Sequence, residues 1–362
     1  MTNPSTIEQI LDIARWAPSG DNTQVWRFEL VDTNHVVIHG FDTRDHCVYD
    51  FEGRPSQISL GTLIENIVLA ASGHSLAVAV ERRSGPDHLP TFDVRFTVEP
   101  NISASPLIAA IPTRSVQRKP LHMRPLSPAE KAALEAAVGA HYSIVWLEGF
   151  QHRLRTAQLL FANAKIRLTM PEAYRVHRKI IAWNSRFSED RVPDQALGAD
   201  PITLRMMKWA MHSWKRVKFL NTYFAGTIAP RLQMDFIPSL ACAAHFVIVP
   251  SGEAKSVDDF IAAGRAVQRF WLTATHLDLQ LQPEMTPLIF ASYVRAQTNF
   301  SQVSELWEQA QRLTRRLEQL LGEDVTNPAV FMGRIGAGQA AVARSTRLPL
   351  NRLWIDSHRN DQ

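Results

Sequence analysis

The sequence predicts an α+β fold in which two related units follow one another along the chain. Both halves contain stretches with the helical spacing of apolar residues and short runs rich in β-branched residues. The 362 residues are 45% hydrophobic, which is enough for one large core or for two domains of about 150 residues each. A polar stretch with arginines at 112–124 separates the halves. We therefore expect a reduced first unit at 1–108 and a larger second unit at 109–362.

Composition excludes several classes of protein. Charged residues make up 20% of the chain, and the 16 glycines and 21 prolines follow no period, which argues against global disorder and collagen-like repeats. Two cysteines, Cys47 and Cys242, are too few for a disulfide framework or a zinc cluster. The net charge of +4 is mild, and no apolar run approaches about 20 residues. We expect a soluble, cytoplasmic protein without a metal site, a nucleic-acid partner or a membrane partner.

The first half reads as two helices, each followed by a pair of strands. Pro18 ends the first helix, and an Asp-Thr-Asn turn joins the first two strands. In order, the expected elements are a helix at 7–17, strands at 25–31 and 35–40, a central apolar helix at 56–72, and strands at 76–82 and 91–98.

The second half begins with a capping box, Ser127 followed three residues later by Glu130. A continuous apolar run at 244–249 predicts a fully buried strand. The expected elements are helices at 129–138, 151–169, 172–186, 203–220, 256–277 and 301–321, strands at 142–146, 244–249 and 329–335, and an extended basic tail at 344–354.

The usual catalytic signatures are missing: the sequence contains no G-x-S-x-G, P-loop, H-E-x-x-H or C-x-x-C motif. Residues 336–341 match a loose G-x-G-x-x-A, and Asp356 lies where a ribose-binding acid would stand. A dinucleotide fold needs a further helix and strand, which Pro349 and the end of the sequence do not allow. A tight turn after a strand is the favoured interpretation.

Three short segments carry groups suited to a ligand. Residues 17–26 (APSGDNTQVW) place a loop of small polar residues after a helix, where Gly20 allows a close approach and Ser19, Asn22 and Gln24 offer donors and acceptors. Residues 113–118 (TRSVQR) and 344–349 (RSTRLP) combine arginines with hydroxyls, which suits a phosphate. Taken singly, each segment is also compatible with a capped turn or a solvated surface strand.

Taken together, these segments resemble the flavin-binding motifs of the nitroreductase-like flavoprotein family. Residues 17–26 resemble its A-P-S-x-x-N-x-Q-P-W segment with Val25 in place of proline, 113–118 resemble its R-x-S-x-R segment, and 345–349 resemble its [KR]-x-R-L-P segment. Residues 271–285 look like the helix and following loop that face the flavin ring. The resemblance covers roughly 5–80, 109–147 and 239–354.

The order of the motifs resembles a tandem fusion of two family units. No arginine segment precedes residue 17, and the second A-P-S-x-x-N is degraded at 137–146. Such a pseudo-dimer implies two mostly antiparallel sheets flanked by helices and one composite FMN site. The first unit would supply Pro18, Ser19, Gly20 and Asn22, and the second would supply Arg114, Ser115, Gln117, Arg118, Gln282, Pro283, Glu284, Met285, Arg344 and Arg347.

Two departures bear on the phosphate ligands. Thr113 and Ser345 stand where the family has basic residues, and Arg118 and Arg344 compensate by a shift of one position. At the flavin, Gln117 or Arg118 would lie near the pyrimidine edge, and a backbone N–H of 283–285 would meet N5.

The resemblance implies an FMN-dependent oxidoreductase that acts on a small conjugated substrate, with NAD(P)H as reductant. No side-chain acid or base is required, so the catalytic residues remain open. The alternative is a flavin-storage protein with a closed lid. The segment at about 165–235 is this expected lid, with aromatics such as Trp209 and Trp214 near substrate; it also fits an amphipathic helix pair with its basic side in water. The chain would be a monomer, as an internal pseudo-dimer, or a homodimer.

Overall fold

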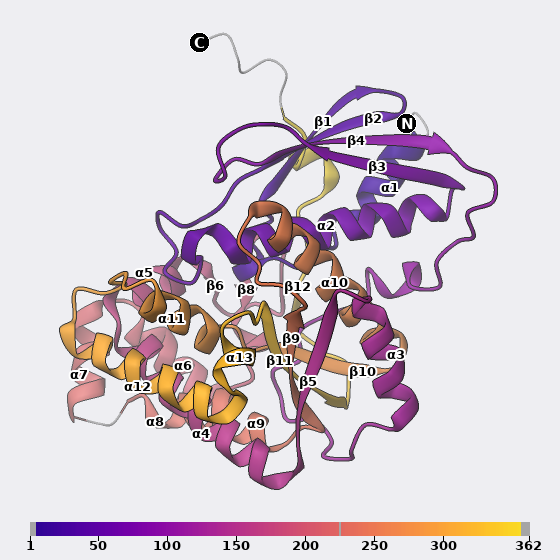
Figure 1. Cartoon of the computed structure of the whole chain (residues 1–362). Coiled ribbons are helices and arrows are strands. Elements are labelled where there is room, and N and C mark those ends of the chain that lie inside the picture. The colour runs from indigo at the N-terminus through magenta and orange to yellow at the C-terminus, as the bar shows by residue number, and fades with distance from the viewer. Residues whose placement is uncertain (1–4, 224–225, 356–362) are drawn as a thin grey trace, which may run out of the picture.

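A computed structural model describes residues 5–223 and 226–355. The fold is α+β, with two four-stranded antiparallel sheets in separate parts of the molecule (Figure 1). The first sheet has the order β1-β2-β4-β3. Its strands are β1 (Trp26–Asp32), β2 (His35–Gly40), β3 (Leu76–Arg82) and β4 (Thr91–Val98). Helices α1 (Thr6–Ala14) and α2 (Arg54–Ser72) pack on it through a core that includes Leu11, Trp26 and Leu63.

The second sheet has the order β10-β11-β9-β5 and is buried on both faces. Its strands are β5 (Tyr142–Glu148), β9 (Ala244–Pro250), β10 (Leu279–Pro283) and β11 (Phe331–Ala337). In β9, Phe246 and Ile248 face one core, whereas Val247 and Val249 face the other. This alternation explains why the strand is apolar at every position.

Helices cover the two faces of the second sheet. Helices α3 (Pro128–Val138) and α10 (Val257–His276) share the core of Phe246. Helices α4 (Gly149–Thr169), α11 (Thr286–Arg295) and α12 (Ser304–Leu321) share the core of Val247. The short helix α13 is Glu323–Thr326, and 3₁₀ turns occupy Gly20–Asn22, Phe51–Gly53, Ile108–Ala110, Asp194–Ala196 and Leu350–Arg352.

The two parts of the molecule meet where α2 crosses α10. The Cα atoms of Gly61 and Gly264 pack so closely that a Cβ built on either glycine would lie 2.9 Å from the other Cα. Beside this crossing, the amide of Gln268 donates to Asn66 Oδ1 (2.7 Å), and both side chains are fully buried. The backbones of the two helices are therefore in direct contact.

The end of the described chain returns to the first sheet. Trp354 forms a parallel bridge with Phe28, and the Phe28 N–H donates to the carbonyl of Leu353 (2.8 Å). Leu348 and Leu353 belong to the core of the first sheet. A segment that the sequence analysis assigned to the second unit is thus packed against the first.

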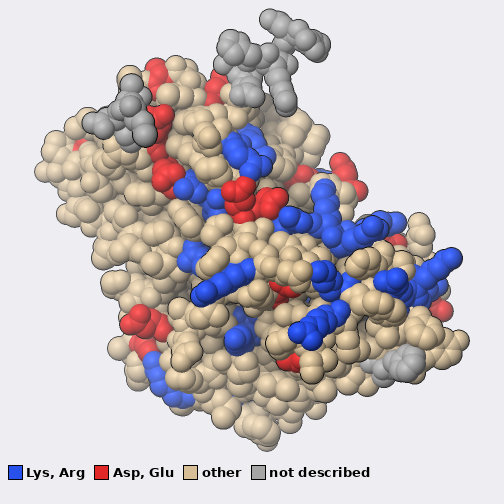
Figure 2. Space-filling view, turned by 180° about the vertical axis from the view of Figure 1, so that it is seen from behind, with Lys and Arg blue, Asp and Glu red and all other residues tan. Residues whose placement is uncertain are grey.

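Most of the region expected to be a lid forms short elements around α4. They are α5 (Pro171–Ile180), β6 (Ile181–Ala182), β7 (Phe187–Ser188), β8 (Val192–Pro193), α6 (Pro201–Ala210), α7 (Trp214–Tyr223), α8 (Ile228–Arg231), a π-helical turn (Leu232–Phe236) and α9 (Ile237–Leu240). β7 pairs with β12 (Arg344–Ser345), and β6 pairs with β8. Several of its basic residues, such as Lys179, Arg205 and Lys218, are exposed, whereas Arg231 is buried. Figure 2 shows lysines and arginines gathered across the middle of the rear face.

Several expected elements differ from the structure. The helix expected at 172–186 ends at Ile180, where the chain turns into β6. The helix expected at 203–220 is two helices, because the backbone leaves the helical path at 211–213. Strand β10 and helix α11 were missed. Residues 338–343 form a loop without a helix, which rules out a dinucleotide turn there, and Asp356 lies outside the described residues.

No helix in the described part of the chain is both long enough and apolar enough to cross a membrane.

The helix crossing makes a prediction about stability. A Cβ at residue 264 would lie 2.1 Å from the Ile58 carbonyl oxygen, so Gly264→Ala must push the helices apart. Overpacking of this kind costs about 1–3 kcal/mol, whereas alanine in an open helix is better than glycine by about 1 kcal/mol. We expect Gly264→Ala to lower the free energy of unfolding in urea. Gly252→Ala, where nothing lies within 4 Å, is the control; equal stability of both variants would contradict the close crossing.

Candidate functional site

A cavity of about 240 Å³ lies beside the helix crossing and is called the cofactor cavity below. Its wall contains every residue expected to contact FMN except Gln117 and Glu284, namely Pro18, Ser19, Gly20, Asn22, Arg114, Ser115, Arg118, Gln282, Pro283, Met285, Arg344 and Arg347. Helix α2 adds Pro55, Ile58, Ser59 and Thr62, and α10 adds Val267 and Trp271. Segments far apart in the sequence therefore form one wall.

The loop after α1 has a strained backbone. Asp21, Asn22 and Gln24 have φ values of 53°, 63° and 50°, a region that side chains other than glycine rarely adopt. Thr62 of α2 donates to the carbonyl of Pro18 (3.0 Å), and Ser19 Oγ accepts from the N–H of Gln24 (2.9 Å). Strain that is held by surrounding contacts is typical of binding sites.

The amides of this loop fasten two distant segments to it. Asn22 Nδ2 donates to the carbonyls of Glu189 (3.1 Å) and Thr346 (3.2 Å). Gln24 Nε2 donates to Glu189 (2.8 Å), and its Oε1 accepts from the N–H of Leu348 (2.9 Å). The segment at 187–192 is thus closed over the loop. Asn22 Oδ1 is buried and has no partner within the described protein.

Three arginines gather at the cofactor cavity without a carboxylate. Arg114 donates to the carbonyl of Trp16, Arg344 donates to Pro112, and Arg347 donates to Ala17. Among the described residues, no ion pair involves any of these three arginines, and the buried Nε of Arg114 has no partner.

The electrostatics of this cluster favour an anion. Burial, followed by the charges of Arg347 and Arg344, holds the pKa of Arg114 well below its usual value. Burial and the neighbouring guanidiniums of Arg344 and Arg15 lower the pKa of Arg347 to about 9. Buried like charges without a counter-ion are costly, so a bound phosphate or carboxylate would relieve them.

Apolar side chains complete the wall. Trp271 of α10 lies under the Arg114 guanidinium, 4.6 Å from its ring centroid, and Val267 precedes it by one helical turn. Ile58, Phe331 and Met285 add further apolar surface. A charged end joined to an apolar wall suits a ligand with an aromatic ring system and a phosphate.

The α2 side of the wall carried a signal in the sequence that was not used. Pro55, Ile58, Ser59 and Thr62 follow the i, i+3, i+4, i+7 spacing of one helix face. Helix α2 is buried on nearly every side, so two hydroxyl residues on one of its faces could have indicated that this face borders a site.

Gln117 and Glu284 do not reach the cofactor cavity. The amide of Gln117 donates to the carbonyl of Gln339 (2.7 Å), so its side chain serves the 338–343 loop. Arg118 does line the cavity, and it donates to the carbonyl of Ala196 (3.2 Å). In the 283–285 loop, the Glu284 N–H donates to Met332 (2.8 Å), and proline has no N–H, which leaves Met285 as the available donor.

A buried arginine joins the segment at 114–118 to the loop at 282–285. Arg334 of β11 donates to the carbonyls of Arg118 (2.8 Å) and Lys119 (3.1 Å) and to Gln282 Oε1 (2.6 Å). Only 1% of its surface is exposed. Arg334 therefore fixes the spacing between the arginine segment at 114–118 and the loop at 282–285.

Glu284 belongs to a buried ionic pair beneath the same loop. Its carboxylate lies 2.7 Å from His245 Nδ1, while His245 Nε2 lies 2.9 Å from the Ser239 carbonyl. Burial alone would lower the pKa of His245, but the Glu284 carboxylate and Cys242 raise the pKa to about 10. The imidazole is therefore protonated and donates to both oxygens.

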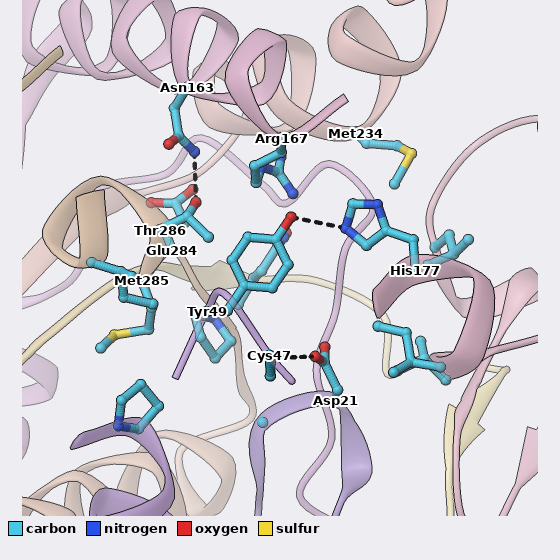
Figure 3. Close-up of a pocket in the computed structure, with 18 of the residues that line it drawn as sticks. Asp21, Cys47, Tyr49, Asn163, Arg167, His177, Met234, Glu284, Met285 and Thr286 are labelled. Carbon is cyan, nitrogen blue, oxygen red and sulfur yellow. Dashed lines mark hydrogen bonds between the residues drawn. The ribbon is translucent and has the colours of Figure 1, made fainter. Parts of the chain in front are cut away.

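A second cavity of about 330 Å³ adjoins the first and is called the inner chamber. Gly20, Asp21, Arg118 and Met285 line both cavities. Figure 3 shows its polar groups: the Tyr49 hydroxyl lies 3.1 Å from His177 Nε2, and Arg167 lies nearby. Arg167 is paired with Asp235 (2.5 Å). Burial, followed by the charge of Arg167, lowers the pKa of His177 to about 3, so its imidazole is neutral.

The expected lid closes the inner chamber, but with residues other than those expected. Its contribution to the chamber wall is mostly apolar: Arg167, Leu168, His177, Ile180, Ile181, Val192, Leu197, Met207, Pro230, Met234 and Asp235. Trp209 is 46% exposed under Arg216, and Trp214 packs on Tyr174. Neither tryptophan lines the chamber or the cofactor cavity, so the expectation that they stack near substrate is wrong.

No family model matches the chain. Two relatives from *Mycobacterium tuberculosis* strains CDC 1551 / Oshkosh and ATCC 25618 / H37Rv, both named "Putative NAD(P)H nitroreductase", are 28% identical over 185 residues, which is 50% of this chain and 52% of theirs. Over this stretch the chain resembles proteins that are named as nitroreductases. It matches about half the length of these curated relatives.

Two solved structures were also found. A nitroreductase-like family protein from *Bacillus cereus* has a TM-score of 0.35 and 12% identity over 71% of this chain and 98% of that one. The FMN-dependent nitroreductase NfnB from *Mycobacterium smegmatis*, solved with NADPH, has a TM-score of 0.34 and 13% identity over 69% and 96% of the two chains.

The His245–Glu284 pair predicts how stability depends on pH. Because the folded-state pKa of His245 is raised to about 10, its contribution is complete below the unfolded value of about 6.5 and is lost as the pH rises through about 10. We expect the urea unfolding free energy to fall over this window. Glu284→Gln should remove most of that decline, whereas Glu253→Gln, an exposed control, should keep it. An unchanged slope in Glu284→Gln would exclude this pair as its source.

Proposed function

We propose that the chain is an FMN-dependent oxidoreductase that uses NAD(P)H to reduce a small conjugated acceptor. The observation that carries the proposal is the cluster of the buried Arg114 and Arg347 with the half-buried Arg344, which has no counter-ion among the described residues and borders an apolar wall. The similarity to curated proteins named as NAD(P)H nitroreductases supports the reductant.

The residues present fit FMN. Arg114, Arg344, Arg347 and Ser115 would hold the phosphate, because three guanidiniums and a hydroxyl meet the demands of a dianion. The unpartnered Asn22 Oδ1 would accept a hydrogen bond from the ligand. Val267 and Trp271 would pack against the ring system.

When bound, FMN supplies the two-electron transfer between the nicotinamide and the acceptor. The protein binds and orients it. Arg118, rather than Gln117, is placed to offer a positive charge, and the Met285 N–H is the free donor of the 283–285 loop. The pair of Glu284 and His245 together with Arg334 holds this loop in position.

We also propose that the site is composite, between two fused nitroreductase-like units at 1–108 and 109–362. The 18–22 loop and α2 would come from the first unit, and the arginine segment and α10 would come from the second. Residues of all four segments line the same cavity. The return of residues 348–355 to the first sheet is consistent with units that exchange chain segments.

To test the proposal, the apoprotein is titrated with FMN, and binding is measured by the change in flavin fluorescence. We expect one FMN per chain, and Arg347→Ala should weaken binding by roughly one to two decades, because a charge-assisted bond contributes about 1.5–3 kcal/mol. Arg316→Ala, an exposed change on α12, should bind as the wild type does. Thermal melting verifies that both variants are folded.

Two outcomes would contradict the proposal. One is a wild-type chain that does not bind FMN, and the other is bound FMN that neither NADH nor NADPH reduces under anaerobic conditions. Unchanged affinity in a folded Arg347→Ala variant would remove this arginine from the phosphate site.

Flavin storage is the second candidate function, and the closed lid favours it. Residues 187–192 are bonded to the 22–24 loop and to β12, and Val192 lines both cavities. A reductant must pass this cover to reach the cofactor cavity.

A variant of the chamber wall separates the two candidates. Met207→Ala removes a side chain from the lid side of the inner chamber and widens it. If the lid limits access, the anaerobic rate of FMN reduction by NADPH should rise while FMN stays bound. Trp209→Ala, which lies on α6 but lines neither cavity, should leave the rate unchanged. Equal rates in both variants and the wild type would show that the lid does not gate reduction.

A further inference from the structure

One side chain joins three hollows of the molecule. Asp21 lines the cofactor cavity, the inner chamber and a surface hollow of about 550 Å³. Within the described ranges, no other residue lines all three of these hollows. The surface hollow also contains the exposed residues Asp45 and His46.

We propose that the carboxyl group of Asp21 carries protons from the surface hollow to an acceptor in the inner chamber. The inference rests on the proposed function, to which it adds a residue of the 17–26 segment as the acid that protonates the acceptor. Such an acid must reach solvent on one side and substrate on the other.

The surroundings leave the Asp21 carboxyl available. Among the described residues it forms no ion pair within 4.0 Å, and its recorded hydrogen bond is a long one from the Cys47 thiol (3.9 Å). Its backbone, at φ 53°, is held between Gly20 and Asn22. Figure 3 shows the Asp21 carboxylate beside Cys47, and both lie below Tyr49 and His177 in this view.

The charges around Asp21 suit a proton carrier. Burial raises the pKa of its carboxyl, Arg118 lowers it, Asp50 raises it, and Cys47 and Arg167 lower it, with a result of about 6. Two other titratable groups of the chamber do not change charge near neutral pH: burial raises the pKa of Cys47 to about 12, and His177 is neutral. Asp235, which is paired with Arg167, also lines the chamber, and burial raises the pKa of its carboxyl. Asp21 can therefore both hold and release a proton under physiological conditions.

The proton balance defines the step. Reduction of a conjugated acceptor adds two electrons and two protons. NAD(P)H supplies both electrons and one of the protons, so one further proton is needed. The Asp21 O–H bond breaks and its proton goes to the acceptor atom that has gained the electron pair. The carboxylate then regains a proton from hydronium or a buffer acid of the bulk solvent, through the surface hollow.

The first test measures the pH dependence of acceptor reduction by the FMN-loaded protein, with menadione as the probe. The wild-type rate should fall as the pH rises through about 6, since the protonated acid is needed. Asp21→Asn should lose this step and be slower at low pH by about a hundredfold. Asp45→Asn, in the surface hollow only, should keep the step. Asp45→Asn should also bind FMN as the wild type does, because Asp45 lines neither the cofactor cavity nor the inner chamber.

The second test needs no cofactor. Infrared difference spectra of the apoprotein, recorded on both sides of pH 6, should show a protonated carboxyl band that Asp21→Asn lacks and Asp45→Asn retains. A wild-type step that persists in Asp21→Asn overturns the proposal, as does an infrared band that survives the substitution. Failure of FMN binding in the wild type overturns the proposed function instead, and the infrared result stands apart from it.

Discussion

The contact of Gly61 with Gly264 sets the geometry on which the rest of the site depends. Because neither residue has a Cβ, α2 and α10 approach until their backbones touch. Each helix then presents one face to the cofactor cavity, Ile58 and Thr62 from α2 and Trp271 from α10. A wider crossing would separate the loop held by Thr62 from the arginine stacked on Trp271.

The charge of the arginine cluster also depends on how the chain folds. Folding removes Arg114 and Arg347 from water and gives them backbone carbonyls as partners, which satisfy N–H groups but do not neutralise charge. By contrast, the equally buried Arg334 lies 3.8 Å from Glu284. One arginine is thus compensated within the protein and serves as a clamp, while the others are left to compensate an anion.

Local signals in the sequence predicted the long elements. Apolar periodicity identified α2 and α10, a continuous apolar run identified β9, and the small polar residues after α1 marked the 18–22 loop. Most of the other residues expected at the cofactor came from the resemblance of short segments to family motifs. Gln117 and Glu284 lie outside the wall of the cofactor cavity because their partners, Gln339 and His245, are distant in the sequence. Tyr49, Arg167 and His177 had no motif; only the fold of the lid brings them to one chamber.

The lid and the strained loop depend on each other energetically. Asn22 and Gln24 donate to carbonyls of the 189–191 segment, and each such bond contributes about 0.5–1.5 kcal/mol. If the 189–191 segment opens as the proposed lid, these bonds break at a cost of about a few kcal/mol, and the open form is a minor population. The loop bonded to this segment holds Asp21, Asn22 and Gln24 at positive φ. Access to the inner chamber would then be coupled to the conformation of the loop that lines the cofactor cavity.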